Sequence, residues 1–169
     1  MKISKLALAS LLLTFAGAAS AQQAAQPARA PAPKPQVTQQ QLTPEQQAQV
    51  ARQDAEMTKA AAQVVQLVDQ NKAAEVWAGA SPVAKGVTNQ DEFVKQITLD
   101  RKKVGAVAER KQVAVTRAVY PVGAEVPAGN YVNVVYATKF ANAPQPVREL
   151  VSFHLDSDQT WRVSGYSLR

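Results

Sequence analysis

The sequence predicts an α+β domain in which two to three N-terminal helices pack on a curved, four-stranded antiparallel sheet. Two observations carry this prediction. Apolar residues recur at helical spacing up to about residue 104, and beyond it they alternate with polar residues at the period of two that marks strands. Helices followed by a run of strands are typical of α+β domains, because strands alternating with helices would instead indicate a parallel sheet. Residues 45–169 are enough for one hydrophobic core.

The first helix is predicted to begin after Thr43. This threonine is a suitable cap, Pro44 fits the first helical position, and Gln46 completes a capping box. Apolar residues then recur on one face of the helix until the pattern fades at Asp69. They are Val50, Met57, Ala61, Val64, Val65 and Val68.

Two further helices are expected before residue 105. A short one runs from Ala73 to Trp77, and the pair Ser81-Pro82 interrupts it. The next helix begins at Thr88 or Asn89. Gly105 is a suitable stop, because glycine readily adopts the left-handed conformation that ends many helices.

Four strands are expected in the second half of the chain. Val113, Val115 and Val119 alternate in the first strand, and the others cover residues 131–140, 147–155 and 160–168, with turn-forming residues between them. Strand alternation assigns one set of side chains in each of two strands to a single face. The first set is Val132, Val134, Tyr136, Thr138 and Phe140, and the second is Val147, Glu149, Val151, Phe153 and Leu155.

Residues 1–21 have the parts of a secretion signal in the right order. Lys2 and Lys5 precede an apolar run from Leu6 to Ala19, and Ala19-Ser20-Ala21 supplies the small residues that signal peptidase requires. An N-terminal anchor or a buried helix is the alternative, but the run is short for a membrane span. We therefore expect cleavage after Ala21, a periplasmic or secreted protein, and no stable membrane anchor after cleavage.

Residues 22–44 are expected to form a disordered tether. Seven Gln, five Ala and five Pro among these 23 residues provide no apolar face to offset the entropy of ordering. The Ala-Pro-Ala-Pro-Lys-Pro stretch favours an extended polyproline II conformation. A docking peptide for a proline-recognising partner is the alternative interpretation.

The composition excludes several classes of function. The chain carries a net charge of +6, yet from Glu45 onward 15 basic residues are nearly balanced by 13 acidic ones. No aromatic residue lies within the short basic clusters, so nucleic acid is not expected as a partner. The absence of cysteine excludes a disulfide scaffold, a thiolate nucleophile and a cysteine-ligated metal. A single histidine, His154, is too little for a multi-histidine metal site, and we expect neither metal nor cofactor.

Several motifs in the second half resemble those of a known family. They are Arg101-Lys102-Lys103-Val104-Gly105 with Arg110 before the first strand, Gly129-Asn130-Tyr131, Tyr136-Ala137-Thr138-Lys139-Phe140-Ala141-Asn142, Glu149, and Trp161-Arg162-Val163-Ser164-Gly165-Tyr166. Over about residues 57 to 169 the chain resembles the exported bacterial family of domains of unknown function number 4019. The element order is also similar to nuclear-transport-factor-2-like and cystatin-like folds. Those folds host enzymes, carriers and structural modules, so the resemblance implies fold and export but no chemistry.

Glu149 is the main candidate for chemistry, because strand alternation directs it toward the core or the mouth of a cavity. Such a carboxylate either has a raised pKa, as a general acid or base, or is held ionised by a cation. Arg101 and Arg110 are the expected partners, and a structural Glu–Arg pair is the alternative to catalysis. Five aromatic residues either line a pocket or serve ordinary packing. They are Tyr131, Tyr136, Phe140, Trp161 and Tyr166.

His154 has the opposite strand parity and is expected to be exposed. Pairing with Asp156 is feasible, since residues two apart share one face of a strand. Ser152 is on the same face, but a Ser152–His154–Asp156 triad is rejected. Side chains about 7 Å apart along one strand stand too far from one another for a proton relay.

Three hypotheses about function follow. The favoured one is an exported, non-enzymatic module that binds an unknown partner protein or small ligand in the concavity of its sheet. The second is a small enzyme of the nuclear-transport-factor-2-like kind, with Glu149 as acid or base and Tyr136 or Arg110 orienting the substrate. The third is a self-assembling structural protein, for example a homodimer that pairs through the outer face of the sheet.

Overall fold

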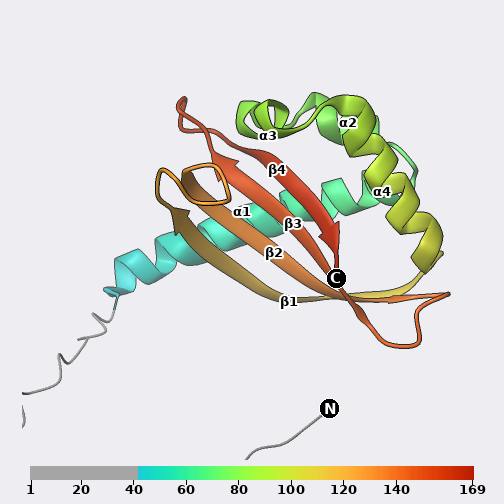
Figure 1. The fold of residues 1–169 in the computed structure, drawn as a ribbon. Helices are drawn as coiled ribbons and strands as arrows, with labels where there is room; N and C mark the ends of the chain where they lie inside the picture. Colours follow the sequence, from blue (N-terminus) through green and yellow to red (C-terminus); the bar gives the residue numbers. More distant parts are fainter. Residues whose placement is uncertain (1–41) are drawn as a thin grey trace, which may run out of the picture. The chain divides into compact units, whose positions relative to one another are not determined.

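The computed structural model describes residues 42–169 and confirms the α+β prediction (Figure 1). The predicted signal peptide, with Ala19 and Ala21, and most of the predicted tether lie outside the described residues. The described part contains four helices and four strands. They are α1 (Pro44–Asp69), α2 (Ala73–Ala78), α3 (Pro82–Val87), α4 (Gln90–Val104), β1 (Val107–Tyr120), β2 (Gly129–Phe140), β3 (Val147–Leu155) and β4 (Trp161–Leu168).

Helix α1 begins as the sequence predicts. The backbone N–H of Gln46 donates to Thr43 Oγ1 at 3.3 Å, and the Gln46 side chain accepts from the Thr43 N–H at 2.9 Å. Pro44 occupies the first helical position, where its missing N–H has no helical partner to lose. The five residues of α1 that are buried all belong to the predicted apolar stripe.

Helix α3 was not expected. The second helix already ends at Ala78, with Gly79 as its C-cap, and the pair Ser81-Pro82 starts α3. The backbone N–H of Val83 donates to Ser81 Oγ at 3.1 Å, and Pro82 is the first helical residue. Serine and proline are unfavourable inside a helix, but at a helix N-terminus the serine hydroxyl accepts from a free backbone N–H and proline lacks no hydrogen bond.

The four strands form an antiparallel sheet in the order β1-β2-β3-β4. Strand β1 begins at Val107, six residues before the first predicted strand residue, so Arg110 lies within the strand and does not precede it. Register shifts interrupt β1 at Ala108 and at Val113, and β4 at Ser164. At Ser164 one extra residue opposes the Ser152–Phe153 pair, which is a β-bulge.

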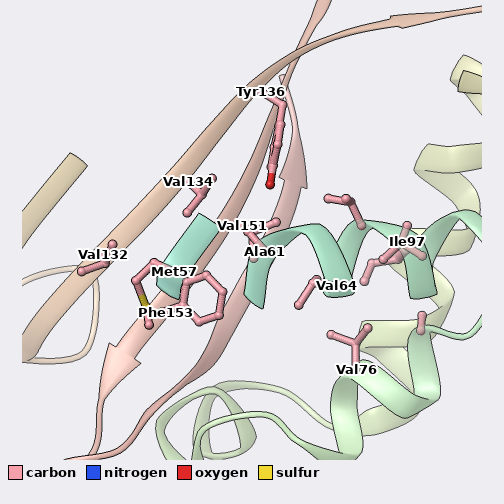
Figure 2. Packing of buried hydrophobic residues seen from close by; sticks show 13 residues of the cluster. Met57, Ala61, Val64, Val76, Ile97, Val132, Val134, Tyr136, Val151 and Phe153 are labelled. Atoms are coloured by element: carbon pink, nitrogen blue, oxygen red, sulfur yellow. The ribbon is translucent and has the colours of Figure 1, made fainter. Parts of the chain in front are cut away.

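The hydrophobic core lies between α1 and one face of the sheet. Figure 2 shows Met57 and Ala61 of α1 against Val134 and Phe153 of the sheet. Helices α2, α3 and α4 gather beside β4 (Figure 1), and Ala80 forms an isolated bridge with Val163. Helix α1 covers the face on which the sequence placed the core, and a hollow of about 200 Å³ remains beside it, lined by Gln53 of α1, Arg117 of β1 and Trp161 of β4.

Candidate functional site

Glu149 is fully buried and held by four hydrogen bonds. Its Oε2 accepts from Arg110 Nε and from Thr138 Oγ1, both at 2.6 Å. Its Oε1 accepts from Tyr166 Oη at 2.8 Å and from Arg110 Nη2 at 3.0 Å. The exposed fraction of Glu149 is 0 %. Since an ionised carboxylate has about four acceptor positions, these bonds use its whole capacity.

Asp69 joins this carboxylate to the ends of two helices. Arg110 donates to Asp69 Oδ2 at 2.8 Å and to Asp69 Oδ1 at 3.0 Å, so its guanidinium bridges two carboxylates. Arg101 contacts Asp69 Oδ1 at 3.0 Å and lies 4.7 Å from the centre of the Phe140 ring. Arg101 therefore reaches Glu149 only through Asp69 and Arg110. We call these residues the Glu149 cluster: Asp69, Arg101, Arg110, Thr138, Glu149 and Tyr166.

Asp69 is the member of the Glu149 cluster that sequence reasoning missed. It is the last residue of α1, and the last turn of that helix has no basic residue. A carboxylate at a helix C-terminus is disfavoured by the helix dipole, so it requires a cation from elsewhere. That unfavourable position was the available signal for a paired Asp69.

The protonation states in the cluster follow from these contacts. Burial opposes the charge of Arg110, but its hydrogen bonds to Asp69 and Glu149 outweigh burial and raise the pKa of the guanidinium. Burial, together with the negative charge of Glu149, raises the pKa of the Tyr166 phenol well above its usual value. The cluster thus contains a charged arginine and a neutral tyrosine whose hydroxyl donates a hydrogen bond to the carboxylate. This geometry favours the structural interpretation of Glu149 over the catalytic one.

The predicted aromatic residues do not converge on one place. Tyr136 stands in the core with its ring directed toward α1 (Figure 2), and its hydroxyl has no hydrogen-bond partner among residues 42–169. Trp161 is partly buried against the same core. At the other end of β2, Tyr131 donates to the carbonyl oxygen of Pro127 at 2.8 Å.

His154 is buried, so the expectation of an exposed histidine was wrong. Its exposed fraction is 6 %, and its ring packs edge-on against the Tyr131 ring, with 4.9 Å between the two ring centres. Its Nδ1 lies 2.8 Å from Asp156 Oδ1. Strand parity alone predicted exposure, but Tyr131 and the segment that carries Ser81 cover this end of the sheet.

Asp156 is the centre of a second polar cluster and not part of a catalytic triad. Ser81 Oγ donates to Asp156 Oδ1 at 2.5 Å, and Arg162 donates to Asp156 Oδ2 at 2.8 Å. Ser152 donates to Asn133 at 2.7 Å, and neither Ser81 nor Ser152 forms a hydrogen bond with the histidine ring. Burial opposes ionisation of Asp156, but the bonds from Ser81, His154 and Arg162 outweigh it and lower the pKa of the carboxyl.

An apolar pocket of about 220 Å³ lies between α3, the β1–β2 loop and β4, and we call it the α3 pocket. Two of the predicted aromatic residues, Tyr131 and Tyr166, line it. The remaining lining residues are Val83, Ala84, Val87, Thr88, Phe93, Val126, Pro127, Ser164 and Gly165. Sequence reasoning did not find this pocket, because residues from five separate segments form its walls.

Comparison with known families assigns the chain. The family described as "Protein of unknown function (DUF4019)" matches residues 60–166, which is more than half of the chain. The chain belongs to the DUF4019 family. A comparison with the curated proteins gave no match. The DUF4019 match begins within α1 and ends at Tyr166, so it includes every member of the Glu149 cluster.

Two searches of this DUF4019 domain for further features gave the following results. Within residues 42–169, no group of three or more His, Asp or Glu side chains is arranged to hold a metal ion. None of the helices in that same range is long and apolar enough to cross a membrane.

Proposed function

We propose that this protein is an exported, non-enzymatic binding module, and that the α3 pocket is its binding surface. The observation that carries the proposal is the state of Glu149. The residue best suited to acid or base chemistry is completely covered, and all its acceptor positions are occupied by Arg110, Thr138 and Tyr166. A general acid or base must reach the substrate directly or through one water molecule, and this carboxylate has no room for either.

The alternative enzyme hypothesis requires Tyr136 or Arg110 to orient a substrate. Tyr136 is buried in the core, with an exposed fraction of 6 %. Arg110 is committed to Asp69 and Glu149. These contacts support a structural role for both, because an orienting residue needs a free polar group in an accessible cleft.

Self-assembly through the outer face of the sheet has less support than binding. That face carries polar side chains such as Asn133 and Ser152, which hydrogen-bond to each other across β2 and β3. An obligate dimer interface is usually a broad apolar patch. Paired polar groups on the face therefore favour a monomeric binding module.

Export is supported by the order of charged, apolar and small residues in the first 21 positions. The test is to express the full chain in a bacterial host, fractionate the cells and determine the N-terminal residue by mass spectrometry. We expect a periplasmic protein that begins at Gln22. Full-length protein that retains Met1 in washed membranes would contradict export.

Binding is tested by incubating immobilised mature protein with a periplasmic extract and identifying the retained proteins and small molecules. Val87 of the α3 pocket is 69 % exposed, so Val87→Asp adds a charge at the pocket without disturbing the core. Val122→Asp is the matched control, since Val122 is 93 % exposed and does not line the pocket. We expect retention by the wild type and the control but not by Val87→Asp. Equal retention by all three proteins would place binding elsewhere, and no retention by the wild type would contradict a binding function.

A further inference from the structure

The side chains that line the α3 pocket are all uncharged among the described residues. A charged ligand would lose its hydration there without gaining a counter-ion, which is strongly unfavourable. Phe93, Tyr131 and Tyr166 provide aromatic surface, and valine and proline side chains form much of the remainder. The walls therefore suit a neutral molecule with a largely apolar body.

Only one buried polar group at the pocket is left without a partner in the described part of the chain. The Tyr131 hydroxyl donates a hydrogen bond to the carbonyl oxygen of Pro127, and the Tyr166 hydroxyl donates one to Glu149 Oε1, each with an O–O distance of 2.8 Å. Ser164 Oγ is buried and has no hydrogen-bond partner within residues 42–169. A buried hydroxyl without a partner is unfavourable, because it has given up hydrogen bonds to water and gained none. A ligand that supplies one hydrogen-bonding atom would remove this cost.

The position of Ser164 is set by the β-bulge in β4. Ser152 is opposite Gly165 and Phe153 is opposite Val163, which leaves Ser164 as the extra residue. A bulge turns a side chain away from the regular alternation of the strand and often does so next to a functional site. Ser164, the extra residue of the bulge, is one of the two residues with an aliphatic hydroxyl that line the pocket, and the other is Thr88.

The size and the rim of the pocket limit what it can hold. A volume of about 220 Å³ is below the roughly 300–1,000 Å³ of pockets for drug-sized ligands, so the occupant is about the size of one ring. Val87 and Val126 line the pocket while 69 % and 36 % exposed. An occupant would remove part of this apolar surface from water, which is favourable.

We propose that the α3 pocket binds a small, neutral, ring-sized molecule that carries one hydrogen-bonding group, and that Ser164 recognises this group. This inference rests on the proposed binding function and specifies its ligand class. Discrimination comes from two sources. The apolar walls reject ions, and the serine hydroxyl favours a molecule with a hydrogen-bonding atom over one of the same shape without it.

The test titrates the mature protein with three probes of similar shape and follows backbone amide resonances by NMR. Phenol is neutral near pH 7 and has one hydroxyl, benzene lacks the hydroxyl, and benzoate is charged. We expect phenol to shift resonances of residues that line the pocket, benzene to bind about five- to tenfold more weakly, and benzoate to have no effect. Phenol that shifts no pocket resonance would overturn the inference.

Three variants locate the site and the hydroxyl effect. Val126→Asp should weaken phenol binding at least tenfold, whereas Val122→Asp in the same loop should leave it unchanged. Ser164→Ala should remove the preference for phenol over benzene while benzene still binds, a selectivity change that a folding defect would not produce. An unchanged preference in Ser164→Ala would overturn the role of Ser164. If the extract retains a partner at the pocket but phenol does not bind, the ligand class is wrong and the binding function stands.

Discussion

Replacing Glu149 with glutamine tests whether the Glu149 cluster holds the fold together. The substitution keeps the shape of the side chain but removes its charge, and it turns one of two acceptor oxygens into a donor. Each oxygen accepts one bond from Arg110 and one from a hydroxyl, at 2.6 to 3.0 Å. Whichever way the amide is turned, its NH₂ group faces an Arg110 N–H, so at least one charge-assisted hydrogen bond is lost.

The expected cost is about 3 kcal/mol. Removing one partner of a buried ion pair typically costs about 3–5 kcal/mol, because the other charge remains buried. The lower end applies here, since Arg110 keeps both of its hydrogen bonds to Asp69. Total stability of a domain of this size is about 5–15 kcal/mol, so the loss is a substantial fraction.

Urea unfolding, followed by the fluorescence of Trp77 and Trp161, measures the change. Glu109→Gln is the matched control, because Glu109 makes a similarly short contact to Lys139, at 2.6 Å, but both side chains are more than half exposed. Exposed ion pairs contribute little to stability, so the control should unfold close to the wild-type midpoint. If Glu149→Gln were no more destabilising than Glu109→Gln, the cluster would not stabilise the fold, and the structural role of Glu149 would be contradicted.

Three further predictions concern other parts of the structure. Gly129 has φ = 144°, and a Cβ there would collide with the His154 ring, so Gly129→Ala should destabilise by about 2–4 kcal/mol in urea unfolding. Gly86→Ala, with open space around the added methyl in α3, should be neutral or stabilising, and similar losses in both variants would refute the steric argument. The lowered pKa of Asp156 means that its contribution is present above pH 4 and lost as the pH falls through the folded value, so the stability gap between wild type and Asp156→Asn should narrow from pH 7 to pH 3. The raised pKa of Tyr166 acts at the other end of the pH range: stability should fall as the pH rises above about 10, where the phenol ionises more readily in the unfolded chain. This fall should be smaller in Tyr166→Phe, and equal alkaline stability profiles of the two proteins would contradict the prediction.

Much of the fold was predictable because its signals are local. The capping box at Thr43, the stop at Gly105 and the alternation along β2 and β3 are each contained within one element. Helix α3 and the early start of β1 were missed for a physical reason. Serine and proline occur both where helices are interrupted and where they start, and here Ser81-Pro82 starts one. Strand β1 is an edge strand whose mostly exposed side chains weaken the alternation.

The candidate site also has one part that was predictable from local signals and one part that was not. Alternation placed Glu149 on the buried face, and Arg110 was correctly expected as its partner. The participation of Asp69 depends on how the end of α1 meets β1, which is a contact between residues 41 positions apart. The burial of His154 likewise depends on Tyr131 and on the segment of Ser81.

By itself, the sequence determined the class of the fold, the family, and the face on which Glu149 lies, because periodicity and capping act over a few neighbouring residues. Only the tertiary structure decided that Glu149 is held by four donor groups and that α1 packs on the buried face of the sheet. It also decided that the pocket lies beside α3. Hydrogen bonds between distant elements, and cavities left between them, depend on how the elements pack, and no local pattern encodes that packing.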